Sequence, residues 1–184
     1  QTLMKQNLKY IIPAIILFLG IFGVFSHRFD LTKEKRYTLS DATVETLKSV
    51  KEPLTVEVYL EGDFPASFKQ LQNETQFLLE EFRKINPKID YKFIDPIATK
   101  MSQDTLQAMG MQPSMLPDMK DGKVSQIVLF PYAALKYKGY GTSISLITNQ
   151  MGIDAAEQLT KSIENLEFNF ASTIKSLVAD QKKN

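Results

Sequence analysis

The sequence predicts a mixed α/β domain that follows a single N-terminal membrane span. Three observations predict it: a charge-free apolar run near the N-terminus, a strand–helix–strand pattern after it, and a hairpin that leads into a long amphipathic helix. The 184 residues include 22 basic and 21 acidic side chains, a formal net charge of +1. That balance gives no electrostatic case for a nucleic-acid partner, which needs a strongly basic face.

The apolar run is Tyr10–Phe25, which has no charged side chain and lies between Lys9 and Arg28. Crossing a hydrocarbon core of ~30 Å takes roughly 17–25 apolar residues, so this run is at the short end. A cleaved signal peptide is the alternative, but no A-x-A-like site follows the run. We therefore predict an uncleaved tail and anchor over residues 1–28. Its expected contact residues are Ile11, Ile15, Phe18, Leu19, Phe22 and Phe25.

Residues 29–53 are predicted to form a polar connector and a short helix. Ser40 is the expected N-cap, and Asp41 lies in the first turn, where a negative charge suits the helix dipole. The helix should run to about Val50. From Leu54 to Leu60 the apolar residues alternate with polar ones, which predicts a half-buried strand.

The next elements predict a βαβ unit. Apolar residues recur at three- and four-residue steps over 65–85, which is typical of an amphipathic helix, and 89–94 is a second strand. We expect the two strands to be parallel with a right-handed crossover.

The second half of the domain should complete the sheet. Its predicted elements are a short helix 103–108, a loop and turn over 112–122, a strand 124–130 that continues or restarts as 133–137, an antiparallel strand 142–147 and a helix 154–179. The domain thus extends over 54–179, and residues 180–184 are interpreted as a linker to a further region.

This order of elements, βαβ-(α)-ββ-α, is that of a thioredoxin-like fold. Such a fold has its reactive CxxC after the first strand, where this chain reads Glu61–Ser67. The chain has no cysteine, so thiol redox chemistry is excluded. A doubly wound sheet is the alternative, but the antiparallel hairpin argues against it.

The residues give no sign of an enzyme. No Walker A sequence is present, so the chain should not hydrolyse nucleotide itself. His27 is the single histidine, which leaves no Ser-His-Asp arrangement and argues against a transition-metal site built on this residue. We predict no catalytic residue, no cofactor and no metal.

Five of the seven methionines fall within 101–119, which is the unusual cluster of this chain. Thioethers are ligands for Cu(I) outside the cytoplasm, and they also pack adaptably at contact surfaces. The methionines expected to form a partner surface are Met109, Met111, Met115 and Met119.

Several stretches together resemble the N-terminal part of the GldG family, the gliding-motility-associated auxiliary, substrate-binding-like subunits of an ABC transporter in Bacteroidetes. They are the apolar anchor, RYTLS at 36–40, LKSVKEPLTVEVYLEGDFP at 47–65, EEFRKINPKIDYKFIDP at 80–96 and NQMGIDAAEQLTKSIENLEFNFASTIKSL at 149–177. These motifs are structural patterns and contain no catalytic signature.

The resemblance implies a non-catalytic subunit in the bacterial inner membrane, with one N-terminal span and its domain in the periplasm. It implies a separate permease and a separate ATPase that binds nucleotide in trans, with one or more copies of this chain in the complex, and a link to gliding motility and protein secretion. The Lys and Arg count around the span favours the opposite orientation. Two other hypotheses stay open: an extracytoplasmic module that captures a solute or Cu(I), and a redox-inactive thioredoxin-like chaperone.

Overall fold

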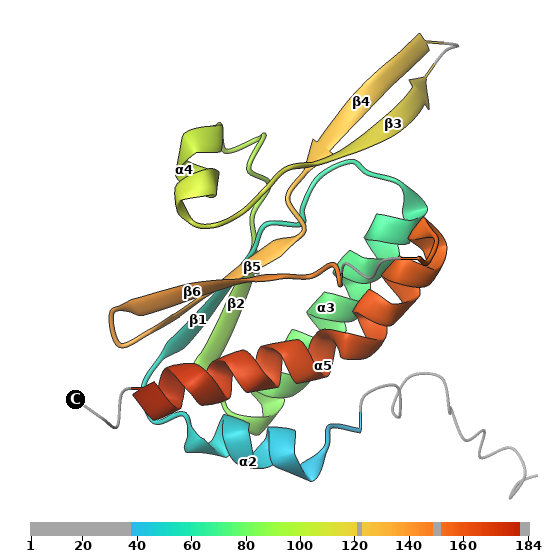
Figure 1. The fold of residues 1–184 in the computed structure, drawn as a ribbon. Helices are drawn as coiled ribbons and strands as arrows, with labels where there is room; N and C mark the ends of the chain where they lie inside the picture. The colour runs from blue at the N-terminus through green and yellow to red at the C-terminus, as the bar shows by residue number, and fades with distance from the viewer. Residues whose placement is uncertain (1–37, 121–122, 149–151, 181–184) are drawn as a thin grey trace, which may run out of the picture. The chain divides into compact units, whose positions relative to one another are not determined.

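The computed structural model describes residues 38–120, 123–148 and 152–180, which belong to one compact unit from Leu39 onward (Figure 1). The elements in chain order are α2 (Asp41–Ser49), β1 (Leu54–Val58), α3 (Ala66–Ile85), β2 (Ile89–Phe93), α4 (Gln103–Ala108), β3 (Ser114–Lys120), β4 (Lys123–Leu129), β5 (Tyr132–Tyr137), β6 (Tyr140–Ser145) and α5 (Ala155–Asp180). The mixed α/β class predicted from the sequence is confirmed.

The main sheet has four strands in the order β2-β1-β5-β6. β1 and β2 are parallel, as predicted, with Leu54 opposite Ile89. β5 is antiparallel to β1, and β6 is antiparallel to β5. The β5–β6 turn consists of Lys138 and Gly139, which both have positive φ, as a two-residue hairpin turn of type I′ requires.

Helices α3 and α5 cover one face of the main sheet, and α2 packs across both of them (Figure 1). The apolar stripe predicted for the last helix is buried here, and Phe170 meets Phe82 of α3 edge-to-face with ring centroids 6.4 Å apart. The opposite face is partly covered by α4. A second core lies there, formed by Tyr59, Leu106, Met111, Phe130 and Ala134.

Strands at 124–130 and 133–137 are confirmed as β4 and the restarted β5, but the loop predicted before them and the sheet expected for β4 were wrong. The loop and turn expected over 112–122 contain strand β3, and the predicted strand 124–130 is β4, which pairs with β3 in a separate two-stranded sheet. β4 therefore does not run on into β5 in the main sheet. Pro113 and Pro117 made the segment look like loop, although a proline is tolerated in an edge strand where its missing N–H faces away from the partner.

The ends of α2 are held by side chains. Ser40 caps the helix as predicted, since its hydroxyl accepts a hydrogen bond from the Thr43 N–H at 3.3 Å. At the other end, the Asn86 amide donates to the Leu47 and Val50 carbonyls at 2.7 and 2.9 Å. Asn86 also accepts from the Lys88 N–H at 3.1 Å, so one side chain links α2 to the start of β2.

Replacing Asn86 with Ala should lower the free energy of unfolding by about 1–3 kcal/mol, because it leaves two carbonyls of α2 without this donor. Asn73→Ala, in the exposed face of α3, is the matched control and should change it by less than about 0.5 kcal/mol. Urea denaturation of both variants measures the difference. Equal values for the two would contradict a capping role for Asn86.

Candidate functional site

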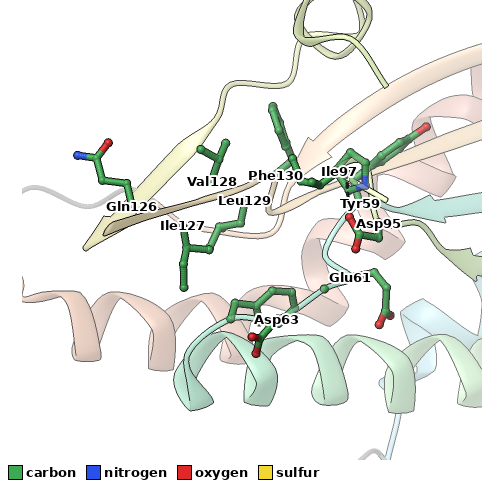
Figure 2. A pocket seen from close by; sticks show the side chains of 13 residues that line it. Tyr59, Glu61, Asp63, Asp95, Ile97, Gln126, Ile127, Val128, Leu129 and Phe130 are labelled. Carbon is green, nitrogen blue, oxygen red and sulfur yellow. Dashed lines mark hydrogen bonds between the residues drawn. The ribbon is translucent and has the colours of Figure 1, made fainter. Parts of the chain in front are cut away.

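A pocket of about 450 Å³ lies where the parallel strands β1 and β2 end (Figure 2). We call it the strand-end pocket. Its walls are Tyr59 and residues 61–64 after β1, residues 95–97 after β2, and residues 126–130 of β4 and its end. The carboxyl ends of parallel strands are where ligands bind in many α/β sheets, because loops there meet without helices covering them.

The two loops of the pocket are fixed by backbone hydrogen bonds. The Tyr59 N–H donates to the Tyr132 carbonyl at 2.8 Å, and the Ile94 N–H donates to the Val58 carbonyl at 2.8 Å. Asp95 then organises its own turn, since its Oδ1 accepts from the Ile97 and Ala98 N–H groups at 2.8 and 3.0 Å. The sheet thereby sets the position of both loops.

Gly62 allows the loop after β1 to approach the turn after β2. Its φ is +136°, a conformation that side chains rarely adopt, and a Cβ at this position would lie 3.4 Å from Asp95 Oδ2. A larger residue at position 62 would be strained by its backbone conformation alone.

The pocket is acidic on its loop side. Glu61, Asp63 and Asp95 line it, and Glu61 accepts a hydrogen bond from Gln72 Nε2 at 2.5 Å. Within the described part of the chain, no Lys or Arg is among the lining residues. Lys69 lies nearby, with its Nζ 5.3 Å from the centre of the Phe64 ring. The loop side of the pocket is therefore lined by carboxylates.

The other side of the pocket is apolar. Leu129 and Phe130 are buried, and Ile127 and Val128 are half-buried. In Figure 2, Ile127 extends from β4 toward the side on which Asp63 lies. Ile97, on the turn after β2, is 63% exposed, which is unusual for a large apolar side chain. An occupant would thus meet apolar side chains along β4 and carboxylates opposite.

Tyr59 connects the pocket to a charged network on the second face of the sheet. Its hydroxyl donates to Glu57 Oε2 at 3.1 Å, and the Glu57 carboxylate is 2.9 and 2.8 Å from the Nζ atoms of Lys92 and Lys136. Burial alone would raise the pKa of Glu57, but the hydrogen bonds from Lys136, Lys92 and Tyr59 outweigh it and lower the pKa to about 2. Burial and the neighbouring Glu57 raise the pKa of Tyr59 to about 12.

A second hollow, of about 460 Å³, lies between α2 and α5. Phe168 on α5 lines it and is 71% exposed. Beside it, the Ser40 N–H and hydroxyl both donate to Glu167 Oε1 at 2.9 Å. Burial would raise the pKa of Glu167, but hydrogen bonds from Thr43 and Ser40 lower it overall. These contacts hold the start of α2 against α5.

The strand-end pocket occupies the position expected for a reactive thiol, directly after β1. Its described lining contains no Cys, His, Ser or Lys, and its ionisable groups are the carboxylates of Glu61, Asp63 and Asp95 and the Tyr59 phenol. Nor does any group of three His, Cys, Asp or Glu among the described residues have an arrangement that could hold a metal ion. What the lining offers is a shaped surface with one acidic and one apolar side.

The predicted contact residues fall into two groups. Those of the anchor, Ile11 to Phe25, lie outside the described residues, and no helix within the described ranges has the length and hydrophobicity needed to cross a bilayer.

The methionines expected at a partner surface do not share one environment. Met111 is 0% exposed in the second core, and Met109 is partly buried against the same core. Met115 on β3 is 59% exposed, and Met119 lies opposite Val124 in the β3–β4 pairing. Met111 therefore packs inside the domain, Met109 packs partly against the same core, and Met115 is exposed.

The residues that line the strand-end pocket were not predicted from the sequence. The sequence could have predicted two of its walls. Residues Glu61–Phe64 and Asp95–Ile97 each follow one of two predicted parallel strands, and ligands often bind at the carboxyl ends of such strands. The third wall could not be placed, since it depends on the pairing of β4 with the unpredicted β3.

Fold and pocket together define a mixed α/β domain with a pocket at the ends of its parallel strands. The chain belongs to DUF7088, a family described as a domain of unknown function, whose model matches residues 33–136. It is also 25% identical over 178 residues to an uncharacterized protein of Borreliella burgdorferi, which covers 96% of this chain. The chain spans about a third (32%) of that relative's length. No solved structure matches the chain significantly.

Replacing Glu57 with Gln should remove a pH-dependent part of the stability. Because the folded pKa is about 2 against 4.5 ordinarily, ionised Glu57 stabilises the fold above about pH 4.5, and this contribution is lost as the pH falls toward 2. We expect the free energy of unfolding of the unaltered protein to drop by about 2–3 kcal/mol more than that of Glu57→Gln over this range.

Urea titrations at several pH values between about 2 and 7 measure this difference. Glu45→Gln, on the exposed side of α2, is the matched control and should change the free energy of unfolding at pH 7 by less than about 0.5 kcal/mol. If Glu57→Gln and the unaltered protein lose stability in parallel, the network around Glu57 has no net effect.

Proposed function

We propose that this chain is a non-catalytic, membrane-anchored periplasmic subunit of an ABC transporter complex linked to gliding motility and protein secretion. The proposal rests on the resemblance of the sequence to the GldG family and on the character of the strand-end pocket. In it, residues 1–28 anchor the protein in the bacterial inner membrane, and the α/β domain contacts other subunits.

The domain in this proposal is thioredoxin-like. The sheet order β2-β1-β5-β6, with β5 and β6 antiparallel, is the order expected of that fold, and α4 lies on the face opposite α3 and α5. The β3–β4 hairpin is then an insertion before β5 that projects from the main sheet (Figure 1). Such an insertion provides contact surface without altering the core.

The observation that carries the proposal is the lining of the strand-end pocket. It occupies the position after β1 where a thioredoxin-like enzyme has its thiols, yet in the described structure it presents carboxylates, a phenol and apolar side chains. A partner protein that presents basic and apolar side chains would be complementary to a pocket of this composition.

The proposed partners are an ABC permease and an ATPase that binds nucleotide in trans, together with the membrane. Permease contact is assigned to the anchor, where Phe18 and Phe22 can pack against a neighbouring helix. One or more copies of the chain would serve each complex.

Purifying the tagged full-length protein from its native membranes in mild detergent should recover a polytopic permease and a Walker-containing ATPase in stoichiometric amounts. Mass spectrometry identifies both. A double variant, Phe18→Ala with Phe22→Ala, should recover less than about a tenth of the permease while the α/β domain stays folded, because the anchor loses its bulky contacts.

Two outcomes would overturn the proposal. Recovery of a lone protein without permease or ATPase would exclude a transporter complex. Recovery of secreted or surface proteins alone would favour the alternative of a redox-inactive thioredoxin-like chaperone.

The periplasmic location predicts a labelling pattern that the cysteine-free sequence makes easy to read. Ser67→Cys introduces one thiol at an exposed position of α3. In spheroplasts, a membrane-impermeant maleimide should label it as fully as it does after detergent lysis. Labelling only after lysis would place the domain in the cytoplasm, as the Lys and Arg count around the span suggests.

A further inference from the structure

The strand-end pocket runs along the edge of a strand. Residues 126–130 line it consecutively, although successive side chains of a strand point to opposite faces. A pocket that touches every residue in such a run lies beside the backbone. β3 occupies one edge of β4, and within the described residues no strand pairs with the other edge. The pocket is therefore on the unpaired edge of β4.

The pairing of β3 with β4 identifies the backbone groups on this edge. Pro117 lies opposite Gln126, and proline has no N–H to give to a ladder. Pro117 and Gln126 thus form one of the non-hydrogen-bonded pairs that alternate along an antiparallel ladder. By the same alternation, Met115 and Val128 form another. The N–H and C=O groups of Gln126 and Val128 consequently point away from β3, toward the pocket.

The composition of the pocket defines what would fit beside this edge. An added strand would meet Ile127 and the exposed Ile97 with apolar side chains and would meet Glu61, Asp63 and Asp95 with basic ones. Four residues of β4, 126–129, line the pocket, and at about 3.3 Å each they span about 13 Å.

We propose that the strand-end pocket binds an extended, basic and apolar segment of a partner protein, which adds as a strand to the free edge of β4. Main-chain hydrogen bonds to Gln126 and Val128 would hold the segment, and its basic side chains would face the three carboxylates. Strand addition is a known mode of peptide recognition in which backbone pairing gives affinity and side-chain pockets give specificity. This inference rests on the proposed function, since it assigns the pocket to a docking partner.

The test uses the full-length protein in a neutral detergent and a fluorescein-labelled peptide, Lys-Val-Lys-Val-Lys, followed by fluorescence anisotropy. We expect saturable binding, and at least about tenfold weaker binding of Glu-Val-Glu-Val-Glu, because like charges would face Glu61, Asp63 and Asp95. Absence of binding by the basic peptide would overturn the inference.

Backbone methylation separates strand addition from simple charge attraction. Two versions of the basic peptide carry N-methyl groups on one or the other alternate set of amides. An added strand uses only the set that faces β4, so one version should bind at least about tenfold more weakly and the other should bind like the parent peptide. If the two versions behave alike, strand addition is overturned.

Variants of β4 test the same point from the protein side. Gln126→Pro removes the outward N–H, which makes no hydrogen bond to β3, and should weaken binding at least about tenfold. The matched Gln126→Ala keeps this N–H and should stay within about twofold. If both variants bind the peptide equally well, the edge of β4 is not its binding site. The methylated peptides decide the question on unaltered protein even if Gln126→Pro disturbs the hairpin.

The docking proposal and the proposed function can be disproved independently of each other. If permease and ATPase are recovered but the basic peptide does not bind, the docking segment is wrong and the transporter assignment stands. If the peptide binds with the expected methylation pattern but no transporter subunits are recovered, the pocket stands and the transporter assignment is wrong.

Discussion

The pairing of β1 on both of its edges is the constraint on which the rest of the domain depends. β1 pairs with the parallel strand β2 on one edge and with the antiparallel strand β5 on the other, so it lies inside the sheet. Its side chains must therefore suit the surroundings of both faces of the sheet. Leu54, Val56 and Val58 are buried toward α3 and α5. On the other face, Glu57 is buried with partners from both neighbouring strands. Breaking either edge would remove one of the two ion pairs of this buried carboxylate, which is costly.

The position of β1 also fixes the strand-end pocket. The chain leaves the sheet at Tyr59, whose N–H is held by Tyr132 at the start of β5, and it leaves β2 at Ile94, which is held by Val58. The loop after β1 and the turn after β2 therefore both start from positions that β1 determines. The loop with Gly62 and the turn with Asp95 come together because their strands are adjacent and parallel.

Most of the main sheet and its helices followed from local periodicity. The steps of three and four in α3 and α5 and the alternation in β1 each reflect burial on one side of a single element, which the sequence records directly. β3 left no such record, because Pro117 and the methionines mask its alternation. The pairing partner of β4 is also determined by tertiary structure and not by local sequence. The strand at 124–130 was therefore predicted at the correct residues but assigned to the wrong sheet.

The same distinction explains what could be foreseen of the pocket. Its acidic loops follow predicted parallel strands, and topology alone points to them, whereas its apolar wall belongs to a hairpin that local patterns did not reveal. A two-stranded hairpin is marginally stable in water by itself, so the β3–β4 unit depends on contacts beyond its own ladder. Its base is secured by Phe130, which is buried in the second core with Tyr59. Farther along, Gln126 is exposed, and among the described strands only β3 pairs with β4, so the second edge of β4 is open to a third strand.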